Sequence, residues 1–306
     1  MYNVLVIGAG AMGLLYAAQL SNSEKINVYF GAKGERYKRL KEQTFLFNDK
    51  KYDFNVIDVE NYSDKQFDLI IIAVKFFQLE ESVNNLDNLI GENTVFVSLL
   101  NGLDSEDVIA SIYGEERVVY SMTVGMDSVR NADGSVTCEN FGKLVFGAKK
   151  ANQIKNVELI KSIFDTAKVA YEIPENIMKS IWWKFMVNVG INQASAVMGL
   201  AYGAFQNSEE VRKPMINLMK EVIILSKYEG IDLDEEEDLN KKWFKVLNSL
   251  SPTAKTSMLQ DVEAKRMTEV DIFAGKVIAL GKKHNVSTPY NQVFFDIIKG
   301  IQSSYL

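Results

Sequence analysis

The chain opens with an apolar run that leads directly into three spaced glycines: Val4-Leu5-Val6-Ile7-Gly8-Ala9-Gly10-Ala11-Met12-Gly13. Four consecutive apolar residues predict a buried strand, and the glycines that follow have the Gly-x-Gly-x-x-Gly spacing. The first glycine permits a tight turn, the second lets a diphosphate approach the backbone, and the third lets helix and strand pack closely. This position predicts a dinucleotide-binding loop, and a purely structural glycine-rich turn is the alternative. The expected cofactor contacts are Gly8, Ala9, Gly10, Ala11, Met12 and Gly13.

Further apolar runs continue this pattern through the first half of the chain. Near-continuous apolar strands separated by helix-like stretches predict a parallel sheet that is covered on both faces. The expected strands are Val4–Ile7, Ile26–Phe30, Asp68–Val74 and Thr94–Leu99, followed by Val118–Val124, Lys143–Phe146 and Val169–Ile173. We therefore assign the first half to the α/β class, as a Rossmann-type nucleotide-binding domain.

The pattern changes after Pro174, where strand signals nearly disappear and helical periodicity dominates. The expected helices are Ile177–Leu200, Ser208–Glu229, Glu235–Leu250, Thr256–Leu280 and Thr288–Lys299. We predict an NADP-binding domain over residues 1–174 and an all-α substrate and catalytic domain over residues 175–306, with the active site in the cleft between them. The acidic run 232–238 is interpreted as a solvated helix start, because carboxylates favour the positive end of the helix dipole.

Composition excludes several classes of protein. Among 306 residues, 47% are hydrophobic and 24% charged, which is typical of a globular protein rather than a disordered or fibrous one. The formal charge of −6 argues against nucleic-acid binding, because an acidic surface repels phosphate backbones. Cys138 and His284 are the only residues of their types, so a disulfide or cysteine-built zinc site is impossible and any Ser-His chemistry must use His284. With no export signal and no bilayer-length apolar run, we expect a cytoplasmic protein that does not enter a membrane.

The end of the second expected strand indicates which dinucleotide binds. An NAD site usually offers a carboxylate at this point for the ribose 2′-hydroxyl. Here Phe30 is followed by Gly31 and Ala32 and then by Lys33 and Arg36, two cations that could bind a 2′-phosphate. The pattern favours NADP(H). Two solvated surface cations are the alternative, and Glu35 is the acid that could bind the ribose instead.

Two polar side chains follow other strands at their carboxyl ends, which is where open α/β sheets bind ligands. Lys75 follows the run Ile70–Val74, and Asn101 follows Val95–Leu100. Lys75 alone would be an ordinary strand-end cation, but together with Asn101 beside a nucleotide loop it indicates function.

In the helical half, Lys184, Asn188 and Asn192 recur at i, i+4 and i+8 in an otherwise apolar segment. This spacing makes one polar stripe on a helix. A desolvated lysine is a suitable general acid, because burial lowers its pKa toward the working pH. A hydrogen-bonded seam between domains is the alternative. Ser257 and Glu269 form another polar cluster, but twelve residues do not place them on one helix face, and Glu269 alone would read as a surface charge.

The whole set of motifs resembles the ketopantoate reductase (2-dehydropantoate 2-reductase) family over nearly the full chain. The resemblance rests on Gly8–Gly13, Ala73-Val74-Lys75 with Gln78, Asn101-Gly102, Trp183-Lys184 with Asn188 and Asn192, Ser257–Asp261, Thr268–Asp271 and Thr288–Asn291. The segment from Ser257 to Glu269 is the most specific of these, since other dehydrogenases with a helical second domain lack it.

The resemblance implies a role for each matching residue. Lys184 would be the catalytic lysine that protonates the ketone oxygen, and Glu269 the acid that pairs with it and orients it. Lys75 would bridge cofactor and substrate, with Asn101 contacting both. The remaining substrate ligands would be Asn188, Asn192 and Ser257. The family typically uses NADPH, in agreement with the independent interpretation of Lys33 and Arg36, and needs no metal.

Three positions depart from the family pattern: Gln193 follows Asn192 where proline is usual, Tyr202 stands where some members have a substrate asparagine, and Lys33 replaces arginine. They leave the 2-oxo acid open. We predict an NADPH-dependent reductase of ketopantoate to pantoate, on the route to pantothenate and coenzyme A, acting as a monomer or homodimer. The alternatives are a D-2-hydroxyacid dehydrogenase of the same family and a non-catalytic NADP-binding sensor, which would not need the lysine, glutamate and asparagine set.

Overall fold

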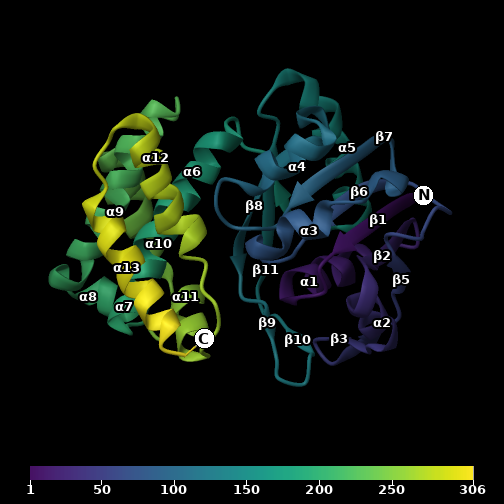
Figure 1. The fold of residues 1–306 in the computed structure, drawn as a ribbon, viewed down its shortest axis with the longest axis horizontal. Helices are drawn as coiled ribbons and strands as arrows, with labels where there is room; N and C mark the ends of the chain where they lie inside the picture. Colours follow the sequence, from purple (N-terminus) through teal and green to yellow (C-terminus); the bar gives the residue numbers. More distant parts are fainter. Residues whose placement is uncertain (306) are drawn as a thin grey trace. The chain divides into compact units, whose positions relative to one another are not determined.

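A computed structural model describes residues 1–305, which divide into two compact units between Ile177 and Met178. The first unit is α/β and the second is helical, so the predicted fold class is confirmed (Figure 1). The division lies three residues after Pro174, where the sequence pattern changes.

The first unit is built on an eight-stranded sheet. In spatial order its strands are β12 (Tyr171–Glu172), β11 (Phe141–Gly147), β8 (Val118–Met126), β7 (Ile90–Ser98), β6 (Phe67–Ile72), β1 (Tyr2–Ile7), β2 (Ile26–Ala32) and β5 (Asn55–Asp58). From β8 to β5, each strand is parallel to the next one in this order. Because β2 lies on one side of β1 and β6 on the other, the strand order reverses at β1, and ligands of such sheets bind at this switch point.

Alternating side chains bury both faces of this sheet. Val4 and Val6 of β1 point to one face, which is covered by α1 (Ala11–Leu20), α2 (Gly34–Glu42) and α5 (Ile154–Ala167). Leu5 and Ile7 point to the other face, which is covered by α3 (Leu79–Val83) and α4 (Ser105–Tyr113). Two-sided burial explains why the strands read as continuous apolar runs.

The sheet differs from the expected parallel one at its far edge, where β11 runs antiparallel to β8. A second, four-stranded sheet was not predicted from the sequence. It consists of β4 (Lys50–Tyr52), β3 (Phe45–Phe47), β10 (Val136–Thr137) and β9 (Val129–Arg130). These strands are only two or three residues long, too short to show a hydrophobic period.

The second unit contains helices, with no strand among its described residues (Figure 1). The α-helices are α6 (Ile177–Val187, which begins one residue before the division), α7 (Gln193–Met198), α8 (Tyr202–Asn207), α9 (Glu209–Tyr228), α10 (Phe244–Ser249), α11 (Ser257–Glu263), α12 (Lys276–His284) and α13 (Pro289–Ser303). Wider π-helical turns span Asn188–Asn192, Glu235–Trp243 and Asp271–Gly275.

One of the expected helices is widened within its length, and another is broken. The expected helix Ile177–Leu200 contains the π-helical turn Asn188–Asn192. The expected helix Thr256–Leu280 is wrong as a single element, because α11 ends at Glu263 and helical structure resumes only at Asp271. Lys265 has a positive φ of 52° within the break, a conformation that ends a helix.

The acidic run is a helix start, as predicted, but it is not solvated throughout. Asp234 caps the helix by accepting a hydrogen bond from the Glu237 amide at 2.8 Å, and Glu235 to Glu237 are exposed. Asp238 is buried at 4% exposure and lies 3.4 Å from the Lys179 ammonium. The carboxylates of Glu235 to Glu237 in the first turn are therefore solvated, whereas the carboxylate of Asp238 is buried.

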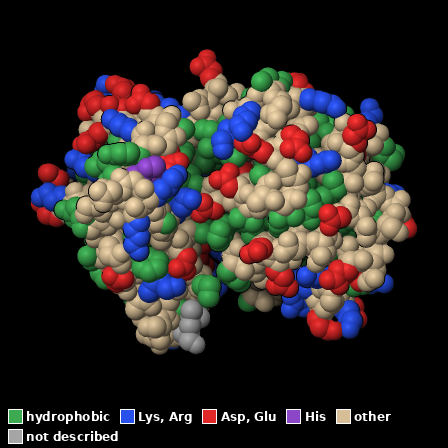
Figure 2. Space-filling view, turned by 45° about the horizontal axis from the view of Figure 1, so that its top comes forward, with side chains coloured by type: hydrophobic (Ala, Val, Ile, Leu, Met, Phe, Trp, Pro, Cys, Tyr) green, Lys and Arg blue, Asp and Glu red, His purple; other side chains and the backbone are tan. Residues whose placement is uncertain are grey.

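Acidic and basic side chains are interspersed over the face shown in Figure 2. Among residues 1–305, no helix is both long enough and apolar enough to cross a bilayer.

Candidate active site

The carboxyl ends of four parallel strands lie in one register row. Gly31 of β2 is level with Ile7 of β1, Ile7 with Ile72 of β6, and Ile72 with Ser98 of β7. The residues just beyond this row therefore meet at one edge of the sheet. Each strand has one residue of interest shortly after this row: Gly8 comes one residue after it, Lys33 two residues, and Lys75 and Asn101 three residues.

The three glycines of the loop have different roles. Gly8 has φ +110°, and a Cβ there would lie 2.5 Å from the Ala73 carbonyl oxygen. A Cβ on Gly13 would overlap the Gly8 carbonyl oxygen. Gly10 has an ordinary φ of −80°, and nothing lies within 4 Å of the position that its Cβ would occupy. The fold itself explains Gly8 and Gly13, whereas Gly10 leaves a bare stretch of backbone that a ligand can approach.

Helix α1 begins at this bare stretch. Its N-cap is Gly10, which has no side chain to cap the helix, and its first turn contains no acidic residue. The first intrahelical hydrogen bond runs from the Leu14 amide to the Gly10 carbonyl, so the amides of Ala11, Met12 and Gly13 precede it. Their N–H groups and the helix dipole favour an anion, which fits the diphosphate of a dinucleotide. The side chains of Ala9, Ala11 and Met12 pack against the hydrophobic core, so these residues offer the ligand their backbone.

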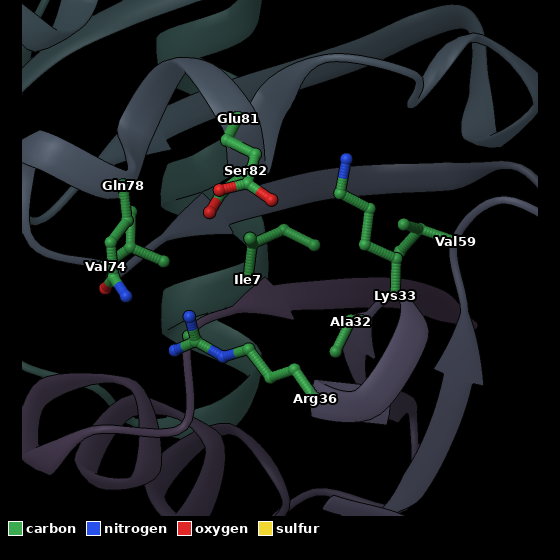
Figure 3. A pocket seen from close by; sticks show the side chains of 11 residues that line it. Ile7, Ala32, Lys33, Arg36, Val59, Val74, Gln78, Glu81 and Ser82 are labelled. Atoms are coloured by element: carbon green, nitrogen blue, oxygen red, sulfur yellow. The ribbon is translucent and has the colours of Figure 1, made fainter. Parts of the chain in front are cut away.

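A pocket lies next to the loop, at the switch point of the sheet (Figure 3). It is lined by Ile7, Gly8, Gly31, Ala32, Lys33, Arg36, Val59, Val74, Gln78, Glu81 and Ser82. The structure thus brings both predicted cations to one pocket, together with an apolar floor on which a flat ring can lie.

One acidic residue lines this pocket and another pairs with one of its cations, and the sequence pattern did not reveal either. Glu60, which follows β5, lies 3.8 Å from the Lys33 ammonium, and Glu81 of α3 lines the pocket opposite Arg36. Neither residue is close in sequence to the end of β2. Glu35, the acid suspected from the sequence, is exposed and forms an ion pair of 2.6 Å with Lys38 instead of lining the pocket.

The guanidinium of Arg36 occupies a cationic environment. Burial lowers its pKa, and repulsion from Arg39 and from Arg130 lowers it further, while Glu81 raises it. An arginine remains charged under these conditions. The local potential nevertheless favours an anionic ligand beside Arg36.

In the helical unit, the predicted stripe is organised around the π-helical turn. The Asn192 amide Nδ2 donates to Asn188 Oδ1 at 3.1 Å, and Ser257 Oγ donates to Asn192 Oδ1 at 3.1 Å. The Met258 amide also donates to Asn192 Oδ1, at 3.4 Å. Asn192 is buried, Asn188 is half-buried and Ser257 is exposed. The array therefore runs from the interior to the surface, and π-helical turns are frequent at functional sites.

The break between α11 and the Asp271 turn explains how Glu269 comes near this array. The Arg266 guanidinium pairs with buried Asp261 at 2.9 Å, which closes the chain reversal. The Thr268 hydroxyl and amide both donate to Gln302 Oε1 of α13, the amide at 2.9 Å. Glu269 is half-buried directly before the turn Asp271–Gly275, which packs against Asn188–Asn192. A single helix would place Ser257 and Glu269 on different faces. The break instead places them on separate segments, each of which packs against the region of Asn188 to Asn192.

Lys184 lies on α6, one turn before Asn188, and is half-buried. The preceding Trp183 donates from its indole to the Asp238 carbonyl at 2.9 Å, and Trp182 packs edge-on against Phe185. These contacts fix the helix on both sides of the lysine. Lys75 is exposed and Asn101 half-buried at the sheet edge of the first unit.

The single histidine has a different environment. His284 Nε2 lies 2.5 Å from Glu229 Oε1, and its ring packs near Tyr228. Its recorded partners are a carboxylate and an aromatic ring, which is not a serine-histidine arrangement.

Two family profiles cover most of the chain. "Ketopantoate reductase PanE/ApbA" matches residues 4–151, and "Ketopantoate reductase PanE/ApbA C terminal" matches residues 176–302. The chain belongs to the ketopantoate reductase family. It is thus an oxidoreductase of the 2-dehydropantoate 2-reductase type with a Rossmann nucleotide-binding fold.

Individual members of the ketopantoate reductase family are distant in sequence. The 2-dehydropantoate 2-reductase of Streptococcus pyogenes serotype M18 is 25% identical over 300 residues, 96% of each chain. A ternary structure of D-mandelate dehydrogenase with NADH and anilino(oxo)acetate superposes with a TM-score of 0.87 at 22% identity, covering 99% of each chain. A dimeric ketopantoate reductase from Staphylococcus aureus superposes with a TM-score of 0.79 at 22% identity, covering 99% of this chain and all of that one. These structures show that the fold is shared.

Proposed function

We propose that the protein reduces ketopantoate to pantoate with NADPH, on the route to pantothenate and coenzyme A. The observation that supports this most is the hydrogen-bonded array Asn188–Asn192–Ser257, whose two asparagines lie on the π-helical turn that follows the helix of Lys184. Such an array offers amide and hydroxyl groups to the hydroxyl and carboxylate of a small oxo acid. A module that only bound the nucleotide would have no need of it.

In this proposal Lys184 is the general acid. A bound NADPH supplies the hydride. The Lys184 ammonium donates a proton to the ketone oxygen as negative charge develops there, and its positive charge stabilises that oxygen before transfer. Glu269 orients the ammonium, because a carboxylate beside a lysine favours the protonated amine and fixes its direction through a charge-assisted hydrogen bond. The ligands of the substrate are Asn188, Asn192, Ser257 and Asn101.

The cofactor is held by the first unit. The amides of Ala11, Met12 and Gly13 receive the diphosphate, and the bare backbone at Gly10 allows its approach. Lys33 and Arg36 receive the 2′-phosphate through charge-assisted hydrogen bonds. Lys75 follows β6 at the same sheet edge and bridges cofactor and substrate.

A D-2-hydroxyacid dehydrogenase that acts on another oxo acid is the second candidate. The D-mandelate dehydrogenase structure contains NADH and an aromatic oxo acid analogue on the same fold. Glu60 and Glu81 at the pocket offer the carboxylates that an NAD-specific site would use. To test this candidate, the activity assay must include NADH as well as NADPH, and an aromatic oxo acid.

For location and assembly, we propose the cytoplasm and a monomer or homodimer. The Staphylococcus aureus relative is described as dimeric. Light scattering of the purified protein distinguishes the two states.

The deciding experiment measures kcat/KM with NADPH and with NADH for four oxo acids: ketopantoate, 2-ketoisovalerate, 2-ketoisocaproate and benzoylformate. We expect ketopantoate with NADPH to be used best. A clear lead for benzoylformate would move the assignment to the mandelate-type dehydrogenases. Absence of oxidation of either cofactor with all four acids, while the protein still binds NADPH, would favour the sensor.

A further inference from the structure

The hairpin formed by β9 and β10 is fixed to the first unit at its base. Asp127 accepts hydrogen bonds from the amides of Glu139 at 3.0 Å and Asn140 at 2.8 Å. The side chain of Asn48 exchanges two hydrogen bonds of 2.8 Å with the backbone of buried Cys138. Asn48 itself belongs to the β3–β4 turn, so the hairpin is attached to an element far away in sequence. It is a positioned element rather than a free surface loop.

This hairpin reaches the glycine loop with two side chains. Ser128 Oγ donates to the Ala11 carbonyl at 3.2 Å, and Arg130 Nη1 donates to the Ala9 carbonyl at 3.4 Å. A single long hydrogen bond uses one of the five N–H donors of a guanidinium. The remaining donors of Arg130 lie at the rim of the loop, and the residue is exposed to an incoming ligand.

The charge of Arg130 has no acidic partner among the described residues. Within residues 1–305, no carboxylate lies within 4.0 Å of the guanidinium nitrogens of Arg36, Arg39 or Arg130. Arg130 lies close enough to Arg36 to lower the pKa of that guanidinium, together with burial and Arg39. Glu81 offsets part of this repulsion at Arg36, and an anion between the two guanidinium groups would reduce it further.

We propose that Arg130, placed at the glycine loop by its contact with the Ala9 carbonyl, is a second guanidinium for the 2′-phosphate of the cofactor and acts together with Arg36. This inference rests on the proposed use of NADP(H). The 2′-phosphate is the better assignment than the diphosphate, because the diphosphate already has the α1 amides, whereas Arg36 lies in the pocket at the end of β2. A doubly charged phosphate monoester matches two planar, bidentate donors.

The test measures ligand binding without turnover. Isothermal titration of the purified protein uses 2′,5′-ADP, which carries the 2′-phosphate, and 5′-ADP, which does not. R130Q removes the charge, R130K restores it without the planar fork, and V129A is the matched control on the same strand, where Val129 is 47% exposed. We expect R130Q to weaken 2′,5′-ADP binding by about tenfold and 5′-ADP binding by about twofold or less, the usual size of a charged hydrogen bond. R130K should recover part of the loss, and V129A should match the wild type.

The outcomes separate this inference from the proposed function. A wild type that binds both nucleotides equally overturns the proposed NADP(H) preference itself. A wild type that prefers 2′,5′-ADP, with R130Q unchanged, overturns only the role of Arg130. An equal loss of both ligands in R130Q assigns Arg130 to the 5′-phosphate or to the loop backbone and overturns the 2′-phosphate assignment. Thermal melting of each variant without ligand shows whether a substitution unfolds the hairpin. If R130Q melts at a lower temperature, the binding data of R130K decide the role of Arg130.

Discussion

Ser257 Oγ donates a hydrogen bond of 3.1 Å to Asn192 Oδ1, joining two motifs that are 65 residues apart in the chain. The hydrogen-bonded array thereby begins at the buried Asn192 amide and ends at an exposed hydroxyl. We expect S257A to raise the KM for the oxo acid by about five- to tenfold with a smaller change in kcat, the worth of one hydrogen bond. Steady-state kinetics with saturating NADPH measure it. The exposed hydroxyl of Ser251 offers a control, S251A, and equal KM values in the two variants would contradict the role.

Lys184 carries the proton-transfer step of the proposed reaction. K184A should lower kcat by roughly 10²- to 10⁴-fold, the usual contribution of a positioned acid. NADPH affinity should hardly change, because in the proposed function Lys184 acts on the oxo acid, whereas the glycine loop, Lys33 and Arg36 hold the nucleotide. Turnover and a separate NADPH titration check both statements. Activity within about threefold of the wild type would remove Lys184 from the mechanism.

In the proposed function, Glu269 acts through Lys184 and should behave as part of one unit with it. E269A should lower kcat, and the E269A/K184A double variant should be little worse than K184A alone, because groups that act together are non-additive. E269Q should retain part of the activity if orientation matters more than charge. Strictly additive losses would make Glu269 a surface charge.

In the proposed function, Lys33 and Arg36 set the cofactor preference. The wild type should prefer NADPH over NADH by at least about tenfold in kcat/KM, and K33A/R36A should erase most of this preference by raising the KM for NADPH. The preference should shrink in high salt, since an exposed phosphate–cation contact is screened. E35A is the matched control, because Glu35 pairs with Lys38 outside the pocket. Equal use of both cofactors by the wild type would contradict this role and would assign the adenosine ribose to Glu60 or Glu81 instead.

Glu106 makes the stability of the first unit depend on pH. Burial raises the pKa of its carboxyl to about 7, although Ser105 and the Ser121 amide donate to it. An acid with a raised pKa binds its proton more tightly when folded, so stability falls as pH rises from about 4.5 to about 7 and is level above that.

E106Q should remove this dependence. The variant should melt close to the wild type near about pH 4.5 and several degrees higher near about pH 8, with a difference of order 1–3 kcal/mol. Melting curves across this range measure the effect. E92Q, at an exposed carboxylate, is the control, and parallel pH profiles for wild type and E106Q would refute the assignment.

The family resemblance and the local patterns predicted much of the fold. The run Val4–Ile7 and the spacing of Gly8, Gly10 and Gly13 specify a strand, a turn and a helix through short-range sterics alone. Short, near-continuous apolar runs identify the buried strands, and their replacement by helical periodicity after Pro174 marks the change to helices. The roles of Lys184, Glu269 and the asparagines remain predictions, since they rest on resemblance and not on a measured activity.

Tertiary structure decided the features that depend on residues distant in sequence. Glu81 reaches the cofactor pocket from α3, and Glu60, which follows β5, pairs with Lys33 of that pocket. Arg130 reaches the glycine loop from a hairpin whose strands are too short to show a period. The chain reversal before Thr268 depends on the Asp261–Arg266 pair and on Gln302, so helical propensity alone predicted a single helix there. Sequence determines what each segment prefers locally. Which side chains share a pocket is set by the packing of the whole unit, because burial and charge pairing act between residues that the chain separates.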